Sequence, residues 1–127
     1  MIAGIGIDRI AIARIEAALD RHGERFVQRI YTEREISQAR AKGHPARRFA
    51  MLFAAKEAVS KALGTGFRQG IALRMIETIH QDSGKPEITL HDAAQLRADA
   101  MDIVNVQLSL TDDGGVAMAF ALAETGA

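Results

Sequence analysis

The sequence predicts an α+β protein in which helices pack on a mainly antiparallel sheet. Helical patterns fill the first half of the chain, and alternating strand patterns fill most of the second half. The later strands come in pairs joined by short turns, which is typical of antiparallel hairpins. The 127 residues, of which 48% are hydrophobic and 25% charged, suit a single domain over residues 1–127 with one core.

Residues 2–8 are predicted to form the first strand. The isoleucines favour β-structure, and Gly4 and Gly6 allow another segment to approach closely. We expect Asp8 to end this strand. Taken alone, an Asp at such a junction more commonly caps the next helix than serves a functional site.

Residues 9–22 suit an amphipathic helix whose apolar stripe is formed by Ile12, Ile15 and Leu19. Arg14, Arg21 and Arg25 recur at intervals of seven and four, so they fall near one face if the helix continues, with Phe26 beside them. Exposed arginines usually serve solubility. A basic face in a protein of zero net charge also suits an acidic partner.

Two further helices are predicted in the middle of the chain. Thr32 and Glu35 have the spacing of a capping box, which starts a helix that ends near Gly43. Pro45 then lies just ahead of a long helix that is rich in alanine, and alanine keeps a helix slim enough for close contact.

The long helix is predicted to end at Gly64, in the left-handed conformation, and Gly66 keeps the following loop free. Glu57 and Lys61 lie four residues apart and share a face of this helix. Without further information, such a pair is most often an ordinary surface ion pair.

The second half of the chain predicts a β-hairpin of residues 72–81 and 86–90, joined by a turn at 82–85. Residues 92–101 are predicted to form a helix. A second hairpin joins residues 103–111 to residues 116–122. Its first strand places one set of side chains on one face: Val104, Val106, Leu108 and Leu110.

Composition excludes several classes of function. The net charge of zero predicts neither a nucleic-acid nor a membrane partner, and no apolar run reaches membrane-spanning length. The absence of cysteine excludes disulfide and thiolate chemistry and is compatible with a reducing cytosol. No signal peptide is visible. The four histidines are scattered without zinc spacing: His22, His44, His80 and His91.

Three segments of the chain form a recognisable set. They are the N-terminal Gly-Ile-Gly-Ile-Asp of residues 4–8, the stretch Phe-Ala-Ala-Lys-Glu-Ala followed by Lys61 and Ala-Leu-Gly-Thr-Gly within residues 53–66, and Gly-Lys-Pro at residues 84–86. Taken together, they resemble the signatures of the holo-[acyl-carrier-protein] synthase family of 4′-phosphopantetheinyl transferases. Their order and spacing match the family over nearly the whole chain. The resemblance implies the fold of these transferases in a short bacterial form.

The resemblance also implies a Mg²⁺-dependent reaction. Phosphopantetheine passes from coenzyme A to a serine of apo-acyl carrier protein, and 3′,5′-ADP leaves. Asp8 and Glu57 would hold Mg²⁺, which prefers oxygen ligands and shares its shell with water and phosphate. Lys61 would steady the leaving phosphate. Glu57, directly or through a metal-bound water, is the favoured base, and the water route is the more plausible because a metal-held carboxylate is a poor base.

Further site residues follow from the same resemblance. The nucleotide would be bordered by Gly64, Thr65, Gly66, Lys85 and Pro86, although Pro86 also suits the start of a strand. Ser109 and Thr111 either reach a phosphate or only form the polar half of an alternating strand. The helix with the basic face would dock the acidic carrier protein through Arg14, Arg21, Arg25 and Phe26. The family implies a cytoplasmic homotrimer of fatty-acid biosynthesis with active sites between subunits.

The chain departs from many relatives in three places. Leu52 stands where they carry Arg, Asp112 where they carry His, and Gly114-Gly115-Val116 where a Tyr often follows. Each departure removes a possible contact to phosphate or ribose, and Arg48, Lys85 or Lys61 could compensate. Two alternatives therefore stay open: a non-catalytic module that binds nucleotide or carrier protein, and the same enzyme acting on a specialised carrier domain of polyketide or peptide synthesis.

Overall fold

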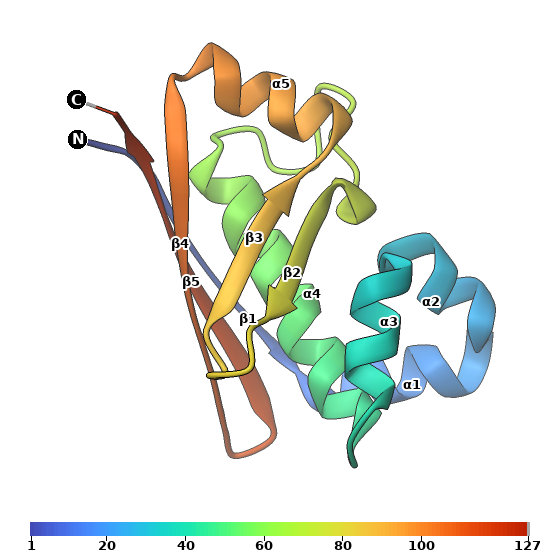
Figure 1. Ribbon diagram of the computed structural model, residues 1–127. Coiled ribbons are helices and arrows are strands. Elements are labelled where there is room, and N and C mark those ends of the chain that lie inside the picture. The colour runs from blue at the N-terminus through green and yellow to red at the C-terminus, as the bar shows by residue number, and fades with distance from the viewer. Residues whose placement is uncertain (127) are drawn as a thin grey trace.

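The computed structural model describes residues 1–126, which form two antiparallel sheets around a central helix, α4 (Figure 1). The elements in chain order are β1 (Ile2–Ala11), α1 (Ile12–His22), α2 (Glu24–Ile30), α3 (Glu33–Arg40), α4 (Pro45–Ala62), the 3₁₀ turn η1 (Leu73–Met75), β2 (Ile76–His80), β3 (Pro86–Leu90), α5 (Asp92–Ala100), β4 (Ile103–Asp113) and β5 (Val116–Thr125).

The larger sheet has the strand order β1-β5-β4, so the first strand of the chain lies at one edge and pairs with the last. The smaller sheet is the β2–β3 hairpin. Helix α4 lies between them, with the larger sheet on one side and the hairpin and α3 on the other (Figure 1). Both sheets are antiparallel, which confirms the predicted α+β class. Within residues 1–126, no helix has the length and apolar character needed to cross a membrane.

Strand β1 is longer than predicted, because β5 continues to pair with it through Ala11 and Val116. Asp8 therefore does not end the strand or cap a helix: it lies within the ladder, opposite Ala119. Helix α1 begins only at Ile12, whose N–H donates to the carbonyl of Gly115. The partner strand, which is distant in sequence, decides where β1 stops.

The first predicted helix also does not continue to Arg25. Gly23 has φ of 52° and separates α1 from a short second helix, α2. A residue with positive φ ends the α-helical hydrogen-bond pattern, and glycine adopts that conformation without a Cβ clash. The basic side chains are thus divided between two helices, with Arg14 and Arg21 on α1 and Arg25 on α2.

Several local predictions are confirmed. Thr32 caps α3 in a complete capping box with Glu35. Pro45 is the first residue of α4, and Gly64 follows its end with φ of +78°. The turn between β4 and β5 is Gly114-Gly115, both with positive φ. Helix α3 ends at Arg40, somewhat before Gly43.

One face prediction is wrong. The register between β4 and β5 shifts between Ile103 and Asn105, and Val104 is 72% exposed. A shift of one residue moves a side chain to the other face of a sheet. Val106, Leu108 and Leu110 do pack against the core, as the alternation indicated.

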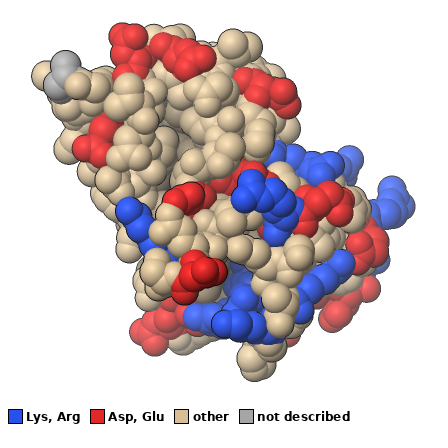
Figure 2. All heavy atoms as spheres, in the orientation of Figure 1, with Lys and Arg blue, Asp and Glu red and all other residues tan. Residues whose placement is uncertain are grey.

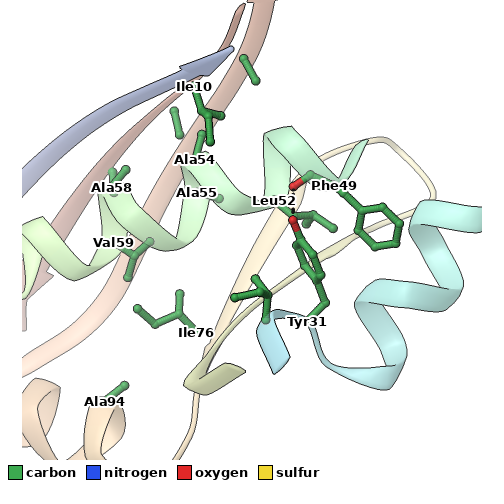
Figure 3. Packing of buried hydrophobic residues seen from close by; sticks show 14 of the residues in the cluster. Ile10, Tyr31, Phe49, Leu52, Ala54, Ala55, Ala58, Val59, Ile76 and Ala94 are labelled. Carbon is green, nitrogen blue, oxygen red and sulfur yellow. Dashed lines mark hydrogen bonds between the residues drawn. The ribbon is translucent and has the colours of Figure 1, made fainter. Parts of the chain in front are cut away.

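The core is centred on α4 (Figure 3). Its sheet-facing side is built from alanines, and the facing side of β5 is built from a second alanine row: Ala117, Ala119, Ala121 and Ala123. At the other end of the core, Tyr31 is fully buried and its hydroxyl donates to the carbonyl of Phe49 at 2.7 Å. Small side chains on one side and aromatic rings on the other let α4 lie close to the sheet.

Candidate active site

Two glycines bring β1 into direct contact with α4. A Cβ built on Gly4 would lie 2.0 Å from the carbonyl oxygen of Ala62, and one built on Gly6 would lie 1.9 Å from that of Ala58. No larger residue fits at these separations. Because side chains alternate along a strand, Asp8 shares the face of Gly4 and Gly6 and is directed toward α4.

Asp8 meets Lys61 at this contact. The ammonium nitrogen of Lys61 lies 3.1 Å from Oδ1 of Asp8 and also donates to the carbonyl of Ile7 at 3.0 Å. The side chain of Asp8 is 18% exposed and that of Lys61 is 50% exposed. The pair lines a cavity of about 290 Å³ together with Ile7, Arg9 and Met118. It therefore belongs to an accessible pocket at the open edge of β1.

Glu57, one turn before Lys61 on α4, is the second carboxylate near the Asp8–Lys61 pair. Partial burial raises its pKa, the negative charge of Asp8 raises it further, and Lys61 acts in the opposite direction. The effect of Asp8 on Glu57 indicates that the two carboxylates are close enough to repel each other. Spacing paired Glu57 with Lys61, and the resemblance paired Asp8 with Glu57 as metal ligands. The structure adds the contact between Lys61 and Asp8.

This donor set fits Mg²⁺. Two mutually repelling carboxylates gain from a divalent cation between them, and Mg²⁺ keeps its remaining positions for water and substrate phosphates. Among residues 1–126, no group of three or more His, Cys, Asp or Glu side chains could hold a metal ion. A metal held at Asp8 and Glu57 would therefore depend on oxygen atoms supplied by water or by a phosphate-containing ligand.

The loop after α4 begins just beyond Lys61. The N–H of Gly64 donates to the carbonyl of Lys61, and that of Gly66 donates to the carbonyl of Ser60. Thr65 is buried, and its hydroxyl donates to the carbonyl of Gly66 at 2.9 Å. Arg97 of α5 donates to the carbonyl of Leu63 at 2.9 Å. The turn that follows Lys61 is thus held in a defined conformation by backbone contacts.

Comparison with known proteins connects this geometry to a family. The sequence model described as the 4′-phosphopantetheinyl transferase superfamily matches residues 4–121, a span that contains the three site residues. The chain belongs to the 4′-phosphopantetheinyl transferase superfamily. It is 49% identical over 126 residues to the holo-[acyl-carrier-protein] synthase of Halorhodospira halophila, a match that covers 99% of this chain and 100% of that relative.

Two solved structures of the superfamily share the fold. The holo-[acyl-carrier-protein] synthase of Neisseria meningitidis superposes with a TM-score of 0.90 at 37% identity, covering 98% of this chain and 100% of that one. The Helicobacter pylori enzyme, solved in complex with coenzyme A, gives a TM-score of 0.83 at 32% identity and covers 94% and 99%. The predicted family and fold are confirmed.

Other residues predicted for the transferase site lie elsewhere in this chain. Ser109 pairs with Phe120 and Thr111 with Met118, and this register places both on the opposite face of the sheet from Asp8. Both are exposed. They are therefore the outward polar half of an alternating strand, and neither lines the Asp8 pocket, although Thr111 is paired with Met118, which does.

Arg48 lies at a second cavity of about 450 Å³, between the end of α3, the start of α4 and the β2–β3 turn. Its guanidinium donates to the carbonyl of Gln38 at 3.2 Å. Gly84 lines this cavity, whereas Lys85 is exposed and does not line it, and Pro86 begins β3 opposite His80. No residue lines both cavities, so the structure does not join Arg48 to Asp8 within one pocket.

The three departures from the family pattern have structural consequences. Leu52 is 4% exposed and belongs to the core, where an Arg would need a partner. Asp112 receives two hydrogen bonds from Arg47, at 3.0 Å and 2.5 Å, and so ties the β4–β5 hairpin to the start of α4. Val116, which follows the Gly114-Gly115 turn, pairs with Ala11.

The predicted docking residues lie on the helical end of the molecule. Arg14, Arg21 and Arg25 are exposed, and Phe26 is half-buried with its ring against the edge of Tyr31. Residues 12–48 contain nine of the sixteen Lys and Arg but five of the sixteen carboxylates, whereas residues 82–127 contain two and eight. Figure 2 shows the result: Lys and Arg gather over the end of the molecule that holds α1–α3.

Sequence reasoning missed a buried charged cluster on the other side of α4. Lys56 and Glu35 are both fully buried and form an ion pair at 2.7 Å. Glu77 lies nearby and accepts a hydrogen bond from Thr32, while contacts to His91 and Arg34 help to hold its pKa below the usual range despite burial. A signal existed: Lys56 lies between Leu52 and Val59 on the buried side of α4.

Proposed function

We propose that this chain transfers the 4′-phosphopantetheine group of coenzyme A to a serine of an apo-acyl carrier protein, with Mg²⁺ as cofactor and 3′,5′-ADP as the product. The observation that carries the proposal is that Asp8 pairs with Lys61 at an accessible pocket, while Glu57 lies one helical turn before Lys61 and within electrostatic reach of Asp8. The superfamily match and the coenzyme A complex of the Helicobacter pylori relative support the substrate.

In the proposed reaction the serine hydroxyl attacks the β-phosphorus of coenzyme A, and the bond from that phosphorus to the oxygen of the departing 3′,5′-ADP breaks. Asp8 and Glu57 would hold Mg²⁺, which supplies charge neutralisation for the two phosphates. Phosphoryl transfer demands mainly positioning and charge stabilisation from the protein.

Glu57 would accept the serine proton, and the route through a metal-bound water is favoured over the direct one because a metal-held carboxylate is a poor base. Without a bound cation, burial and the negative charge of Asp8 raise the pKa of Glu57 above its usual range. Lys61, with its ammonium beside Asp8 and half of its side chain exposed, would contact the leaving phosphate and balance the charge that develops there.

The proposal includes a homotrimer whose active sites lie between subunits. The outer face of the larger sheet carries an exposed apolar row, in which Ile5 is 61%, Ile7 is 67% and Phe120 is 41% exposed. Ile7 and Phe120 are paired neighbours, and Ile7 and Met118 also line the Asp8 pocket. An apolar face that runs into the pocket supports a second copy that covers the face and completes the site with Ser109 or Thr111.

The nucleotide end of coenzyme A is proposed to contact Gly64–Gly66, Lys85, Pro86 and Arg48, from one or both copies. The acidic carrier protein is proposed to dock on Arg14, Arg21, Arg25 and Phe26, at the basic end of the molecule (Figure 2). With coenzyme A and carrier protein as substrates, the chain would act in the cytoplasm and serve fatty-acid biosynthesis.

The experiment that tests this proposal is incubation with coenzyme A, MgCl₂ and apo-acyl carrier protein, followed by the intact mass of the carrier. The expected result is a mass increase of one phosphopantetheine on the carrier serine, which disappears when Mg²⁺ is chelated. A non-catalytic module would bind coenzyme A or the carrier without any mass change, and that result would refute the proposal.

A further inference from the structure

Lys56, the residue directly before Glu57, makes all of its hydrogen bonds to acceptors in the protein interior. Its ammonium group donates to Oε1 of Glu35 at 2.7 Å, to the carbonyl of Ile76 at 2.6 Å and to that of Leu73 at 3.0 Å. An ammonium has three N–H groups, and three acceptors satisfy all of them. The side chain is fully buried, so none of these contacts is shared with solvent.

Glu35 extends this anchor to two further elements. Its Oε1 also accepts the N–H of Thr32, which starts α3, and its Oε2 accepts the N–H of Thr78 in β2, both at 2.9 Å. The ammonium of Lys56 also lies 5.6 Å from the centre of the Tyr31 ring. One buried cation on α4 is therefore tied to the start of α3, to η1 and to β2.

The opposite side of α4 provides much less control over helix rotation. There the buried contact consists of alanines against Gly4 and Gly6, and the polar contacts to β1 come from Lys61, whose side chain is half exposed. Small side chains permit close approach but interlock weakly. Among the directional contacts of α4, those of Lys56 are fully buried and reach three acceptors, so they resist rotation of the helix about its axis most strongly. Successive residues on a helix are separated by about 100°.

We propose that Lys56 is a positioning residue for the active site: its buried contacts to Glu35, Leu73 and Ile76 fix the rotation of α4, so that Glu57 faces Asp8. This inference rests on the proposed function in so far as Asp8 and Glu57 hold a divalent cation. Residues that orient metal ligands without touching the metal typically contribute a factor of about 10 to 100 in metal affinity or activity.

The test compares Lys56→Met with the double variant Lys56→Met, Glu35→Gln. The single variant leaves the carboxylate of Glu35 buried without its cation, so we expect a large fall in Tm. The double variant removes both charges, and we expect it to recover most of that stability. Binding of Mn²⁺, measured by electron paramagnetic resonance without coenzyme A, and kcat and KM for transfer are then compared with the unmodified chain.

If Lys56 positions Glu57, the dissociation constant of the double variant for Mn²⁺ is higher by a factor of about ten or more. Its kcat falls by a similar factor, and its KM for the carrier protein is nearly unchanged. Tyr31→Phe is the matched control, because it removes a buried hydrogen bond to α4 at Phe49 and leaves Lys56 in place. It should lower Tm without changing the Mn²⁺ dissociation constant.

A further experiment restores the positive charge at position 56 chemically, which is possible because the chain contains no cysteine. Lys56→Cys can be alkylated in denaturant with 2-bromoethylamine and refolded, which restores an ammonium of nearly the same reach, whereas bromoethane gives a neutral counterpart. Only the ammonium form should regain Mn²⁺ binding.

The inference is overturned if the double variant binds Mn²⁺ and turns over like the unmodified chain, or if Tyr31→Phe weakens Mn²⁺ binding equally. Failure of the unmodified chain to transfer phosphopantetheine would instead refute the proposed function. The comparison of Mn²⁺ dissociation constants needs no turnover and still decides the role of Lys56.

Discussion

Lys61 and Asp8 form an ion pair at 3.1 Å, across the contact between α4 and the edge strand β1. The two residues are 53 positions apart in the sequence. The ammonium of Lys61 therefore shares with a divalent cation the same carboxylate, while its own proposed task lies with the leaving phosphate. Removing the ammonium group of Lys61 should strengthen the binding of a divalent metal ion and lower the rate of turnover.

We expect Lys61→Met to tighten Mn²⁺ binding in the absence of coenzyme A by about fivefold, the factor that corresponds to ~1 kcal/mol of repulsion between neighbouring charges in a solvated site. The same variant should lose kcat for phosphopantetheine transfer, because the leaving phosphate loses its counter-charge. Electron paramagnetic resonance gives the first quantity and steady-state kinetics the second. Weaker Mn²⁺ binding together with lost turnover would contradict the assigned roles.

Gly6→Ala tests whether close packing of β1 on α4 builds the site. The new Cβ would lie 1.9 Å from the carbonyl oxygen of Ala58, so the strand or the helix has to move. We expect a loss of ~1–3 kcal/mol in the free energy of unfolding, as for other overpacked cores, and weaker Mn²⁺ binding because Asp8 moves away from Glu57.

Gly43→Ala is the control for that variant, because no atom lies within 4 Å of its added Cβ. It should change neither urea unfolding nor Mn²⁺ binding. Equal behaviour of the two variants would show that the glycine contact does not position the site.

The pKa of Glu57 should respond to its two charged neighbours in opposite directions. Its pKa is raised by burial and by Asp8 and is lowered by Lys61. In metal-free buffer, Asp8→Asn should therefore lower the pKa of Glu57, and Lys61→Met should raise it further. Titration of the Glu57 side-chain carboxyl by ¹³C NMR measures both. A shift of the same sign in both variants would contradict the geometry.

The raised pKa also affects stability. Between the ordinary pKa of a glutamate and the raised value, the folded chain binds more protons than the unfolded chain, so Glu57 makes the free energy of unfolding fall as pH rises through this window. Glu57→Gln removes that loss. Without metal, the variant should gain stability relative to the unmodified chain as the pH rises above the ordinary pKa of a glutamate, as measured by urea unfolding. A stability difference that is independent of pH would count against the shift.

The basic end of the molecule predicts electrostatic docking. Arg14→Glu should raise the KM for acyl carrier protein by about fivefold or more at low ionic strength, with KM for coenzyme A nearly constant, and added salt should reduce the difference. Arg68→Glu is the matched control, because Arg68 is also exposed and lies outside α1 and α2. If both reversals raise the carrier KM equally, the basic surface has no specific docking role.

The sequence was sufficient for the local features of this fold. The capping box of Thr32 and Glu35, the proline that starts α4 and the two hairpins depend on neighbouring residues, and all are present. The family and fold class were also predictable, since three motifs occur in the right order. The features that depend on contacts between distant segments could not be predicted from the sequence.

The extension of β1 past Asp8 illustrates this limit. It follows from pairing with β5, which lies more than a hundred residues later. The shift that exposes Val104 is likewise a property of two paired strands. The burial of Lys56 depends on Glu35, which is 21 residues away on another helix, and a lysine in an alanine-rich helix otherwise suggests a solvent-exposed position.

The same limit applies to the site. Asp8, Glu57 and Lys61 were identifiable by resemblance, and their convergence follows from the glycine contact between β1 and α4. Ser109 and Thr111 share a strand face that points away from Asp8, which alternation alone could have placed on either side of the sheet. Their proposed role depends on a second subunit, whose position a single chain's sequence pattern does not contain.

The most direct test of the Asp8–Glu57 site is transfer by Glu57→Ala and by Glu87→Ala, each with coenzyme A, apo-acyl carrier protein and limiting MgCl₂, followed by intact mass of the carrier. Glu57 is half-buried beside Asp8, whereas Glu87 is an exposed glutamate in β3. The account predicts that Glu87→Ala modifies the carrier at the unmodified rate and that Glu57→Ala, still folded, does not. Near-normal modification by Glu57→Ala would contradict it.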